Sequence, residues 1–389
     1  MQAPTDQRTD VSSSDQQLLK LRATVGSREE FSFRTGSGVH SSDRFRPAER
    51  CLLDVIYDVD PDDLLVVDAN YGVLGVVPAG FGTNVVMTET SARATDRCRE
   101  NARRNAVSDR VTVALTSSPA VVSDPVAVAC IAPRPYAATD IISQRIADTL
   151  AILEPGGRLL IAGDPHSGIR RYKSRLETLC PDVTQVFERD GYRVFEAIRP
   201  PSFDPPELVS SQLLRPTVNS VSLTLVTRPG LFSASRLDSG TRALAEQLSL
   251  QNDDSVLDLC CGYGPLGVYA AQLTAEHVVM SDDDCVATTC ARESAACSGV
   301  NDRVEVVTAD GIRGVADHTF DRVLCNPPTH AGAPILHELM HGAREVLATD
   351  GTLHLVHHAG IDFDRYLAPY FDKVVADHAG EYRVACATR

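Results

Sequence analysis

The residues best suited to chemistry are Asn326, Pro327 and Pro328, which directly follow the apolar run from Asp321 to Cys325. A run of that kind is typical of a buried strand, so we expect the three residues at a strand end. Two consecutive prolines fix the backbone and remove two N–H donors. Asn326 is then held rigidly, with its side-chain oxygen and the nearby carbonyls facing the site as acceptors. Such acceptors suit the exocyclic NH₂ group of a base, because they orient its nitrogen for attack on a methyl group by positioning and electrostatics.

A second group of candidate residues is the glycine-rich loop Asp258-Leu-Cys-Cys-Gly262-Tyr-Gly264-Pro-Leu-Gly267. Gly262 and Gly264 permit a tight turn and a close approach of the backbone to a ligand, and Gly267 lets the following helix pack nearby. By itself, a loop of this kind is equally compatible with a dinucleotide.

Two carboxylates follow the next apolar runs. Asp282 comes about 20 residues after the glycine loop, where a carboxylate can accept hydrogen bonds from ribose hydroxyls. Asp310 follows the third run and is placed to reach an adenine amino group. We interpret the neighbouring Asp283 and Asp284 as solvated loop residues.

These residues need a sheet that brings several strand ends together. Short Val- and Leu-rich runs alternate with helix-sized intervals in both halves of the chain. The runs are residues 64–67, 84–87, 111–114, 126–131 and 158–162, and then 255–259, 277–280, 303–307, 321–325 and 352–356. This alternation predicts an α/β fold with a mostly parallel, doubly wound sheet and helices on both faces, in which ligands bind outside the carboxyl ends of the strands.

The two halves are copies of one another. Tyr71-Gly-Val-Leu-Gly75 is repeated as Tyr263-Gly-Pro-Leu-Gly267, at an offset of 192 residues, and other short matches keep the same order and nearly the same spacing. The sequence therefore predicts a polar, flexible tail over residues 1–25, a first domain over 26–199, a proline-rich linker over 200–215 and a second domain over 216–389.

With these motifs in place, the chain resembles class I S-adenosylmethionine-dependent methyltransferases that act on amino groups. It is most similar to the tandem-domain ribosomal RNA guanine-N2 methyltransferases of the RsmC/RlmG type. Asp258, Gly262 and Gly264 match the glycine-loop motif of that family, and Asp282 matches its acidic ribose-binding position. The segment Asn326 to His330 matches its Asn-Pro-Pro-Phe-His motif. A further segment before the first strand matches through Gly230-Leu-Phe232-Ser233 and Asp238-Ser-Gly240-Thr241.

The resemblance implies two tandem Rossmann-like domains and transfer of a methyl group from S-adenosylmethionine to the N2 amine of a guanine in ribosomal RNA, with the small subunit favoured. It implies that Asn326, Pro327 and Pro328 are catalytic and that Thr329 and His330 contact the substrate. The cofactor-binding residues that it implies are Phe232, Ser233, Asp238, Thr241, Asp258, Gly262, Gly264, Asp282, Asp310 and Asn326. One departure concerns the target base, because Thr329 replaces the aromatic residue that stacks on it in the family.

The first half lacks the corresponding chemical groups. Ala132-Pro-Arg-Pro135 stands where Asn-Pro-Pro is expected, the first loop glycine is missing, and only Glu89 remains at the ribose position. In the family a degenerate first copy supports the fold or helps to bind RNA. The basic residues of this half are equally compatible with phosphate contacts and with solvated helix faces; they are Arg97, Arg99, Arg103, Arg104, Arg170, Arg171, Lys173 and Arg175.

Other patterns argue against metal chemistry. His337-Glu338-Leu-Met-His341 fits a zinc-binding pattern, but no third ligand is evident, so we predict no metal. The eleven cysteines include no Cys-x-x-Cys pair, and small thiols in a reducing cytoplasm are the simplest interpretation.

The charge composition indicates adaptation to high salt. The chain of 389 residues has a net charge of −15, with 35 Asp, 17 Glu and 34 Arg but only 3 Lys. A surface rich in Asp and nearly free of Lys suits a protein that stays hydrated in high salt, as in a halophilic archaeon; an Arg-biased genome with an acidic surface is the alternative.

The sequence also limits the cellular setting. No stretch reaches the length of a membrane span, which favours a cytoplasmic protein without a membrane partner. The sequence favours a monomer without fixing the oligomeric state, and the expected partner is ribosomal RNA or a ribosomal subunit precursor. Alternatives are a methyltransferase acting on guanine-N2 of transfer RNA, on adenine or on a protein amide, and a non-catalytic RNA-binding assembly factor.

Overall fold

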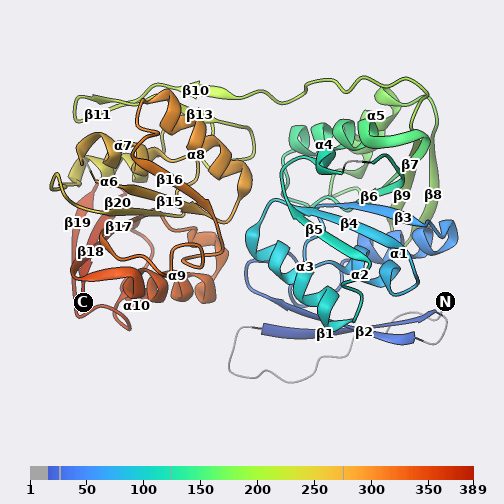
Figure 1. The fold of residues 1–389 in the computed structure, drawn as a ribbon, viewed down its shortest axis with the longest axis horizontal. Helices are drawn as coiled ribbons and strands as arrows, with labels where there is room; N and C mark the ends of the chain where they lie inside the picture. The colour runs from blue at the N-terminus through green and yellow to red at the C-terminus, as the bar shows by residue number, and fades with distance from the viewer. Residues whose placement is uncertain (1–15, 26–27, 123, 275) are drawn as a thin grey trace. The chain divides into compact units, whose positions relative to one another are not determined.

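The computed structural model describes residues 16–25, 28–122, 124–274 and 276–389 (Figure 1). The chain divides into two compact units, with the boundary between Val209 and Ser210. Each unit contains a seven-stranded sheet of its own.

The sheet of the first unit has the strand order β5-β4-β3-β6-β7-β9-β8. The first five strands in this order are parallel, and β9 pairs antiparallel with both β7 and β8. The strands are β3 (Asp63–Val67), β4 (Asn84–Glu89), β5 (Val111–Leu115), β6 (Val126–Ile131), β7 (Leu153–Gly163), β8 (Val183–Arg189) and β9 (Tyr192–Ile198).

Helices cover both faces of this sheet. One face packs against α1 (Pro47–Val59), α2 (Val73–Ala79) and α3 (Ala92–Arg104), and the other against α4 (Thr139–Ile152) and α5 (Ile169–Leu179). The 3₁₀ turn η1 (Pro119–Val121) follows β5. Apolar side chains therefore alternate between two cores, as the twofold periodicity of a strand requires.

A hairpin precedes the first sheet. Strand β1 (Gln16–Val25) pairs antiparallel with β2 (Arg28–Gly36), and Phe31 and Phe33 of β2 are fully buried in the core beside α1. The sequence prediction of a flexible tail over residues 1–25 differs from this result over Gln16–Val25. Pairing with β2, whose Phe31 and Phe33 are buried, gives this segment of mixed polar and apolar residues a regular structure. Residues 1–15 lie outside the described residues.

The sheet of the second unit repeats the first, with the order β16-β15-β14-β17-β18-β20-β19. Again five strands are parallel and the last two form an antiparallel hairpin. The strands are β14 (Val256–Leu259), β15 (Val278–Asp282), β16 (Val304–Thr308), β17 (Phe320–Cys325), β18 (Leu347–His358), β19 (Lys373–Ala379) and β20 (Tyr382–Thr388).

The helices of the second unit also form two layers. One layer is α6 (Ser239–Gln247), α7 (Pro265–Leu273) and α8 (Cys285–Cys297), and the other is α9 (Ala333–Val346) and α10 (Asp364–Leu367), with the 3₁₀ turn η2 (Thr329–Ala331) before α9. Two small antiparallel pairs complete the unit: β10 (Gln212–Leu214) with β13 (Leu225–Thr227), and β11 (Thr217–Val218) with β12 (Val221–Ser222).

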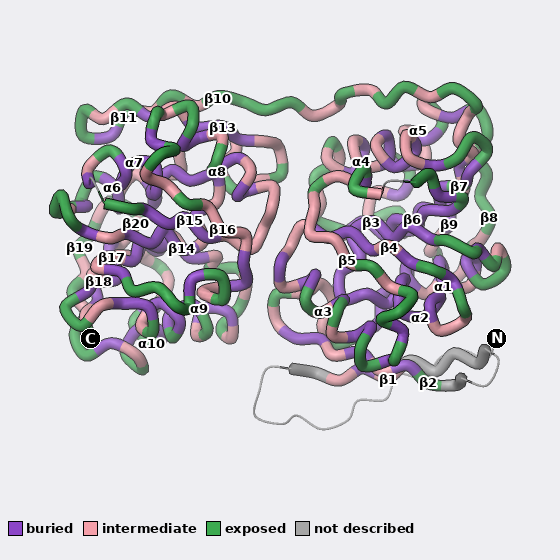
Figure 2. Tube along the Cα trace, viewed as in Figure 1, coloured by how far each residue is buried: buried purple, intermediate pink, exposed green. Residues whose placement is uncertain are grey.

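The predicted fold class is thereby confirmed in both units. The central strands of each sheet are largely buried between their helix layers, whereas the edge strands β8 and β19 consist of partly and fully exposed residues (Figure 2). In the second unit β14 is followed in sequence by β15 on one side, whereas β17 lies on its other side. The chain therefore reverses its winding between β14 and β17, which is the place where open parallel sheets bind ligands.

Candidate active site

The predicted site residues of the second unit come from the carboxyl ends of four neighbouring strands. The glycine loop follows β14, Asp282 ends β15, Asp310 follows β16, and Asn326 follows β17. Phe232, Ser233, Asp238 and Thr241 lie between β13 and the first turn of α6, and the predicted residues 327–330 directly follow Asn326. The fold therefore brings loops from one edge of the sheet to a common place.

Asn326 is bound to the start of α6. Its Nδ2 atom donates to the Thr241 Oγ1 atom at 2.9 Å and to the Asp238 Oδ2 atom at 3.2 Å. Asp238 is also the N-cap of α6, because its carboxylate accepts from the Thr241 backbone N–H at 2.8 Å. Three predicted residues that lie up to 88 positions apart thus form one cluster.

Asp258 lies beneath the glycine loop. Its side chain is nearly fully buried, and its Oδ2 atom accepts from the backbone N–H of Gly267 at 2.7 Å. Burial raises the pKa of this carboxyl from 3.8 to about 7. Asp258 therefore ties the first turn of α7 to β14 from within the protein.

Asp282 holds the other side of the same loop. Its Oδ2 atom accepts from the Gly262 backbone N–H at 2.8 Å, and its Oδ1 atom accepts from the Asp284 N–H at 2.9 Å. Burial raises its pKa as well. A carboxylate has about four acceptor positions, so these two bonds orient it and leave capacity for hydroxyl donors.

The backbone of the glycine loop explains its residue types. Gly262 and Gly264 have φ values of +58° and +85°, a region that glycine adopts without strain. A Cβ atom at Gly264 would lie 2.9 Å from the Met280 sulfur, whereas one at Gly262 would meet no atom within 4 Å. The space over Gly262 is therefore open, and a side chain there would occupy it.

The thiols of this loop are unreactive. Hydrogen bonding to the Cys325 thiol, and then burial, hold the pKa of Cys260 well above its usual range. Burial does the same for Cys261. The site therefore contains neutral thiols and no activated cysteine nucleophile at these positions.

The remaining parts of the predicted site are Asp310 and the loop before α6. Asp310 is buried and pairs with Arg313 at 3.3 Å, and the preceding Ala309 N–H donates to the Asp282 backbone carbonyl at 2.9 Å. Phe232 is 67% exposed, and Thr329 and His330 are also exposed. These exposed side chains are accessible to a large substrate.

Tyr263 is a residue that the sequence analysis did not select. It is buried, and its hydroxyl lies 3.4 Å from the backbone carbonyls of Ser233 and Arg236. It therefore fastens the loop carrying Phe232 to the glycine loop. The sequence signal for this residue was the repeat, in which Tyr263 matches Tyr71. In the first unit the Tyr71 hydroxyl donates to the Arg44 carbonyl at 3.2 Å in the same way.

In the first unit, protein side chains occupy the matching polar positions. Glu89 is buried, and it accepts from the Arg134 Nη2 atom and from the Asn70 backbone N–H, each at 2.6 Å. Arg134 belongs to the loop that replaces Asn-Pro-Pro. The Arg46 Nη2 atom donates to the carbonyls of Ala132 and Pro133 in that same loop, at 2.6 and 2.8 Å.

Several of the predicted basic residues of the first unit have acidic partners. Arg97 lies 2.7 Å from Glu100 and Arg99 lies 3.3 Å from Asp96, and Lys173 pairs with Glu177. The phosphate contacts expected of these clusters stay a prediction.

The His-Glu-x-x-His segment lies on α9 with its two rings against tyrosines. The His337 ring centroid is 5.1 Å from that of Tyr366, and the His341 ring is 5.5 Å from Tyr370. Over the described ranges, no group of three or more His, Cys, Asp and Glu residues is placed to hold a metal ion.

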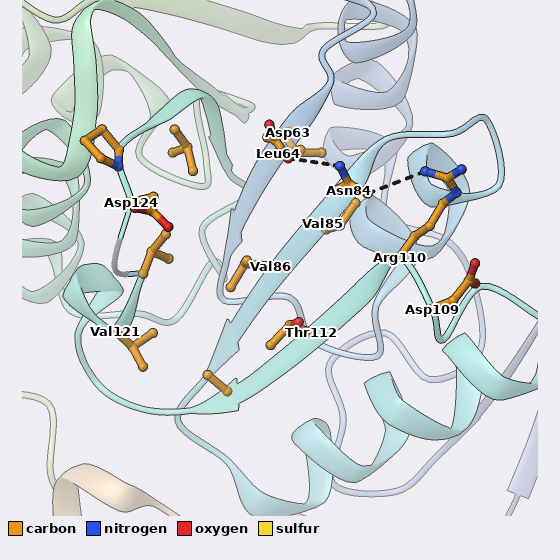
Figure 3. A pocket seen from close by; sticks show the side chains of 14 residues that line it. Asp63, Leu64, Asn84, Val85, Val86, Asp109, Arg110, Thr112, Val121 and Asp124 are labelled. Carbon is orange, nitrogen blue, oxygen red and sulfur yellow. Dashed lines mark hydrogen bonds between the residues drawn. The ribbon is translucent and has the colours of Figure 1, made fainter.

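A pocket of about 530 Å³ lies elsewhere, in the first unit (Figure 3). It opens at the amino-terminal ends of β3 and β4, where Asn84 bonds to Asp63 at 3.2 Å and to Arg110 at 3.4 Å. The pocket thus lies at the amino-terminal ends of strands, whereas the predicted chemistry of the second unit lies at the carboxyl ends of its strands. Within the described part of the chain, no helix combines the length and apolar character that a membrane crossing needs.

The doubly wound sheet and its loop cluster define a Rossmann-like α/β protein, with the unit present twice. A family model described as the methyltransferase small domain matches residues 30–196 and again residues 222–385. The chain belongs to this methyltransferase family.

Individual relatives carry more detailed names. The chain is 30% identical over 191 residues to ribosomal RNA small subunit methyltransferase C of Pseudoalteromonas atlantica, a match that covers 48% of this chain and 54% of that protein. It is 27% identical over 262 residues to the Marinomonas protein of the same name, covering 63% of this chain and 71% of that protein. These relatives come from bacteria and give no support to an archaeal source.

A solved structure matches most of the chain. It is the T. thermophilus 16S rRNA N2 G1207 methyltransferase (RsmC) in complex with AdoMet and guanosine, with a TM-score of 0.77 and 22% identity. The match covers 92% of this chain and 95% of that one. At this level of identity the likeness concerns the fold.

Proposed function

We propose that the second unit transfers a methyl group from S-adenosylmethionine to the N2 amine of a guanine in small-subunit ribosomal RNA. The observation that carries this proposal is the position of Asn326. It lies at the switch point of a methyltransferase sheet. Its amide nitrogen is hydrogen-bonded to the start of α6, and the two residues that follow it in the chain are both prolines. The names of the relatives support the choice of RNA and of base.

The residues present fit the proposed cofactor. Asp282 is fixed by backbone donors and keeps acceptor capacity for a ribose hydroxyl. The open space over Gly262 lets a ligand approach the backbone of the loop. In this proposal Asp310, which follows the adjacent strand β16, contacts the adenine amino group. When bound, S-adenosylmethionine supplies an electrophilic methyl group on its sulfonium.

The residues of the chain contribute to the reaction by positioning the amine of the base. The Asn326 Oδ1 atom accepts from the exocyclic amine of the base, and Pro327 and Pro328 keep that acceptor in a fixed place. Holding the amine in this way lowers its conjugation with the ring and directs its lone pair toward the methyl group. The new C–N bond would form as the methyl–sulfur bond of the sulfonium breaks and leaves a neutral thioether, and the amine would lose a proton to solvent. No metal or covalent nucleophile is needed.

The exposed side chains receive the RNA. We assign Thr329 and His330 to the substrate side of the site and Phe232 and Ser233 to the cofactor side, in the loop that Tyr263 fastens. A target base in a helix must be extruded from its stack to reach Asn326. The partner in this proposal is small-subunit RNA or its precursor in the cytoplasm.

The first unit has a supporting role in this proposal. Arg134 fills the position beside Glu89, and Ala132 has no acceptor side chain where the second unit has Asn326. The proposal thus confines the chemistry to residues 216–389 and assigns structural support or RNA binding to residues 26–199.

The proposal is tested with purified protein, small-subunit ribosomal RNA and a methyl-labelled cofactor. Wild type is expected to produce N2-methylguanosine, identified by mass spectrometry of the nucleosides. Asn326→Ala is expected to bind S-adenosylmethionine within about twofold of wild type and to lose transfer by at least about 100-fold. Undiminished transfer by Asn326→Ala, or labelling of adenosine, transfer RNA or protein instead, would count against it.

A further inference from the structure

We infer that Asp238 and Thr241 are positioning residues, which fix the Asn326 amide so that its oxygen faces the substrate amine. The inference rests on the proposed function for its consequence in turnover. Its structural basis is the hydrogen-bond cluster at the start of α6.

One atom of Asp238 is the centre of this cluster. Its Oδ2 atom accepts from the Thr241 backbone N–H at 2.8 Å, from the Thr241 hydroxyl at 3.2 Å and from the Asn326 Nδ2 atom at 3.2 Å. The Asn326 Nδ2 atom also donates to the Thr241 Oγ1 atom at 2.9 Å. The three side chains therefore bond to one another as a closed triangle.

The chemistry of the partners determines which way the amide points. An ionised carboxylate only accepts, and a hydroxyl has a single hydrogen. Because Thr241 gives that hydrogen to Asp238, its oxygen can only accept from Asn326. Both partners of the amide are then acceptors, so the NH₂ end must face them and the Oδ1 atom must point away. A flipped amide would place its oxygen against two acceptor oxygens and lose both bonds.

The start of α6 is itself held in place. Gly240 lies between Asp238 and Thr241, and a Cβ atom there would lie 2.9 Å from the Tyr382 ring of β20. Only glycine allows this close packing of the helix start against the sheet. Each residue of the Asp-x-Gly-Thr motif thus has a role. Asp238 caps α6 and accepts from Asn326, and Gly240 allows the helix start to pack against the Tyr382 ring. Thr241 supplies the hydroxyl.

The first unit provides an internal comparison. Its helix α1 starts at the equivalent place, and Arg46 and Glu49 occupy the positions of Asp238 and Thr241, while Ala132 occupies that of Asn326. There the Arg46 side chain binds backbone carbonyls of the loop, at 2.6 and 2.8 Å. Where the amide is absent, the aspartate and the threonine hydroxyl are absent as well, and the Glu49 carboxylate accepts from the Arg46 backbone N–H at 3.4 Å instead. This is expected if the task of Asp238 and Thr241 is to orient the amide.

The test compares Thr241→Val with Thr241→Ser. Valine removes the hydroxyl at nearly constant volume, and serine keeps it. We expect Thr241→Val to lower kcat about tenfold, with the KM for RNA and the Kd for S-adenosylmethionine within about twofold of wild type. Thr241→Ser is expected to stay within about twofold of wild type in all three.

Thr274→Val is the matched control. Thr274 is also buried and hydrogen-bonded, to the Asn252 carbonyl at 2.9 Å, but it lies near the amino-terminal edge of the same sheet. It is expected to lower the unfolding midpoint without changing kcat. A purely structural role for Thr241 would make the two valine variants behave alike.

A second pair of variants covers the case in which Thr241→Val does not fold. Asp238→Asn can place its amide oxygen where Oδ2 lies and keep the acceptor, whereas Asp238→Ala cannot. We expect Asp238→Asn to retain more than about a third of kcat and Asp238→Ala to lose at least about tenfold.

A readout without turnover separates this inference from the proposed function. The side-chain NH₂ protons of Asn326, assigned in NMR spectra by comparison with Asn326→Ala, should exchange slowly in wild type and Thr241→Ser and faster in Thr241→Val. This result is expected even if wild type methylates no guanine, in which case only the proposed function fails. Equal exchange in all variants, or a weaker Kd for S-adenosylmethionine with unchanged kcat in Thr241→Val, would overturn the positioning role.

Discussion

Asp258 is a carboxyl group whose environment makes it a weak acid. It is 1% exposed, and its Oδ2 atom accepts from the Gly267 backbone N–H. Its pKa is about 7 in the folded chain, mainly because of burial, against 3.8 for the unperturbed group. The native state therefore keeps a proton between about pH 4 and pH 7 that the unfolded state has released. Stability from this group is greatest below pH 4 and is lost as the pH rises to about 7.

Asp258→Asn isolates this effect, because asparagine can still accept from Gly267 but does not titrate. The free energy of unfolding of wild type minus that of the variant should fall as the pH rises from 4 to 7 and level off above about pH 8. Urea unfolding of both proteins at several pH values measures this difference. A difference that stays constant with pH would show that Asp258 is ionised throughout.

Asn326 shows what could and could not be predicted at the residue scale. Its place after a buried strand and before two prolines was evident in the sequence, because proline restricts the chain locally. Its contacts with Asp238 and Thr241 were not, since they span 88 and 85 positions and depend on how α6 packs against the sheet. The sequence assigned those two residues to the cofactor through the resemblance alone.

The glycine loop is the element on which the proposed cofactor site depends. Gly262 has φ +58° and open space at its Cβ position. Gly262→Ala should cost about 1 kcal/mol of stability from the left-handed backbone and should also place a methyl group in the ligand space. The expected result is a weaker Kd for S-adenosylmethionine, by about tenfold or more, measured by calorimetry.

Gly299→Ala is the control for backbone strain. Gly299 follows α8, has φ +71° and likewise has no atom within 4 Å of its Cβ position. It should lose a similar amount of stability while leaving cofactor affinity unchanged. If both variants bind S-adenosylmethionine as wild type does, the ligand does not approach Gly262.

At the element scale the alternation of apolar runs and helices predicted the parallel strands of both sheets. It did not predict β1, because Gln16–Val25 mixes polar and apolar residues and becomes a strand through pairing with β2. It also did not show that Arg134 would fill the space beside Glu89, since only folding brings a side chain from the loop after β6 to the end of β4. Short-range patterns thus identify elements, and long-range contacts decide how their ends are used.

The whole molecule has an acidic surface that should respond to salt. The chain has a net charge of −15 and 3 Lys, so added salt should first increase its stability by screening charge repulsion. This screening is nearly complete once the Debye length reaches about 3–4 Å, near 1 M salt. A protein adapted to high salt should continue to gain stability beyond that point. We expect the thermal midpoint to rise between 1 and 3 M KCl by several degrees.

The alternative of an Arg-biased genome gives a different curve. An ordinary acidic protein should reach a plateau by about 0.5–1 M KCl, because only charge repulsion is being screened. Thermal unfolding over 0.1–3 M KCl distinguishes the two, and a plateau would remove the argument for a high-salt cytoplasm.

The most direct test of the proposed reaction is made on the RNA of the cell. Ribosomal RNA from a strain lacking this protein is digested, and its nucleosides and fragments are compared with those of the parent strain by mass spectrometry. The account predicts the loss of one N2-methylguanosine from small-subunit RNA, restored by the wild-type gene but not by Asn326→Ala. An unchanged set of methylated guanosines in the small subunit, or full restoration by Asn326→Ala, would contradict it.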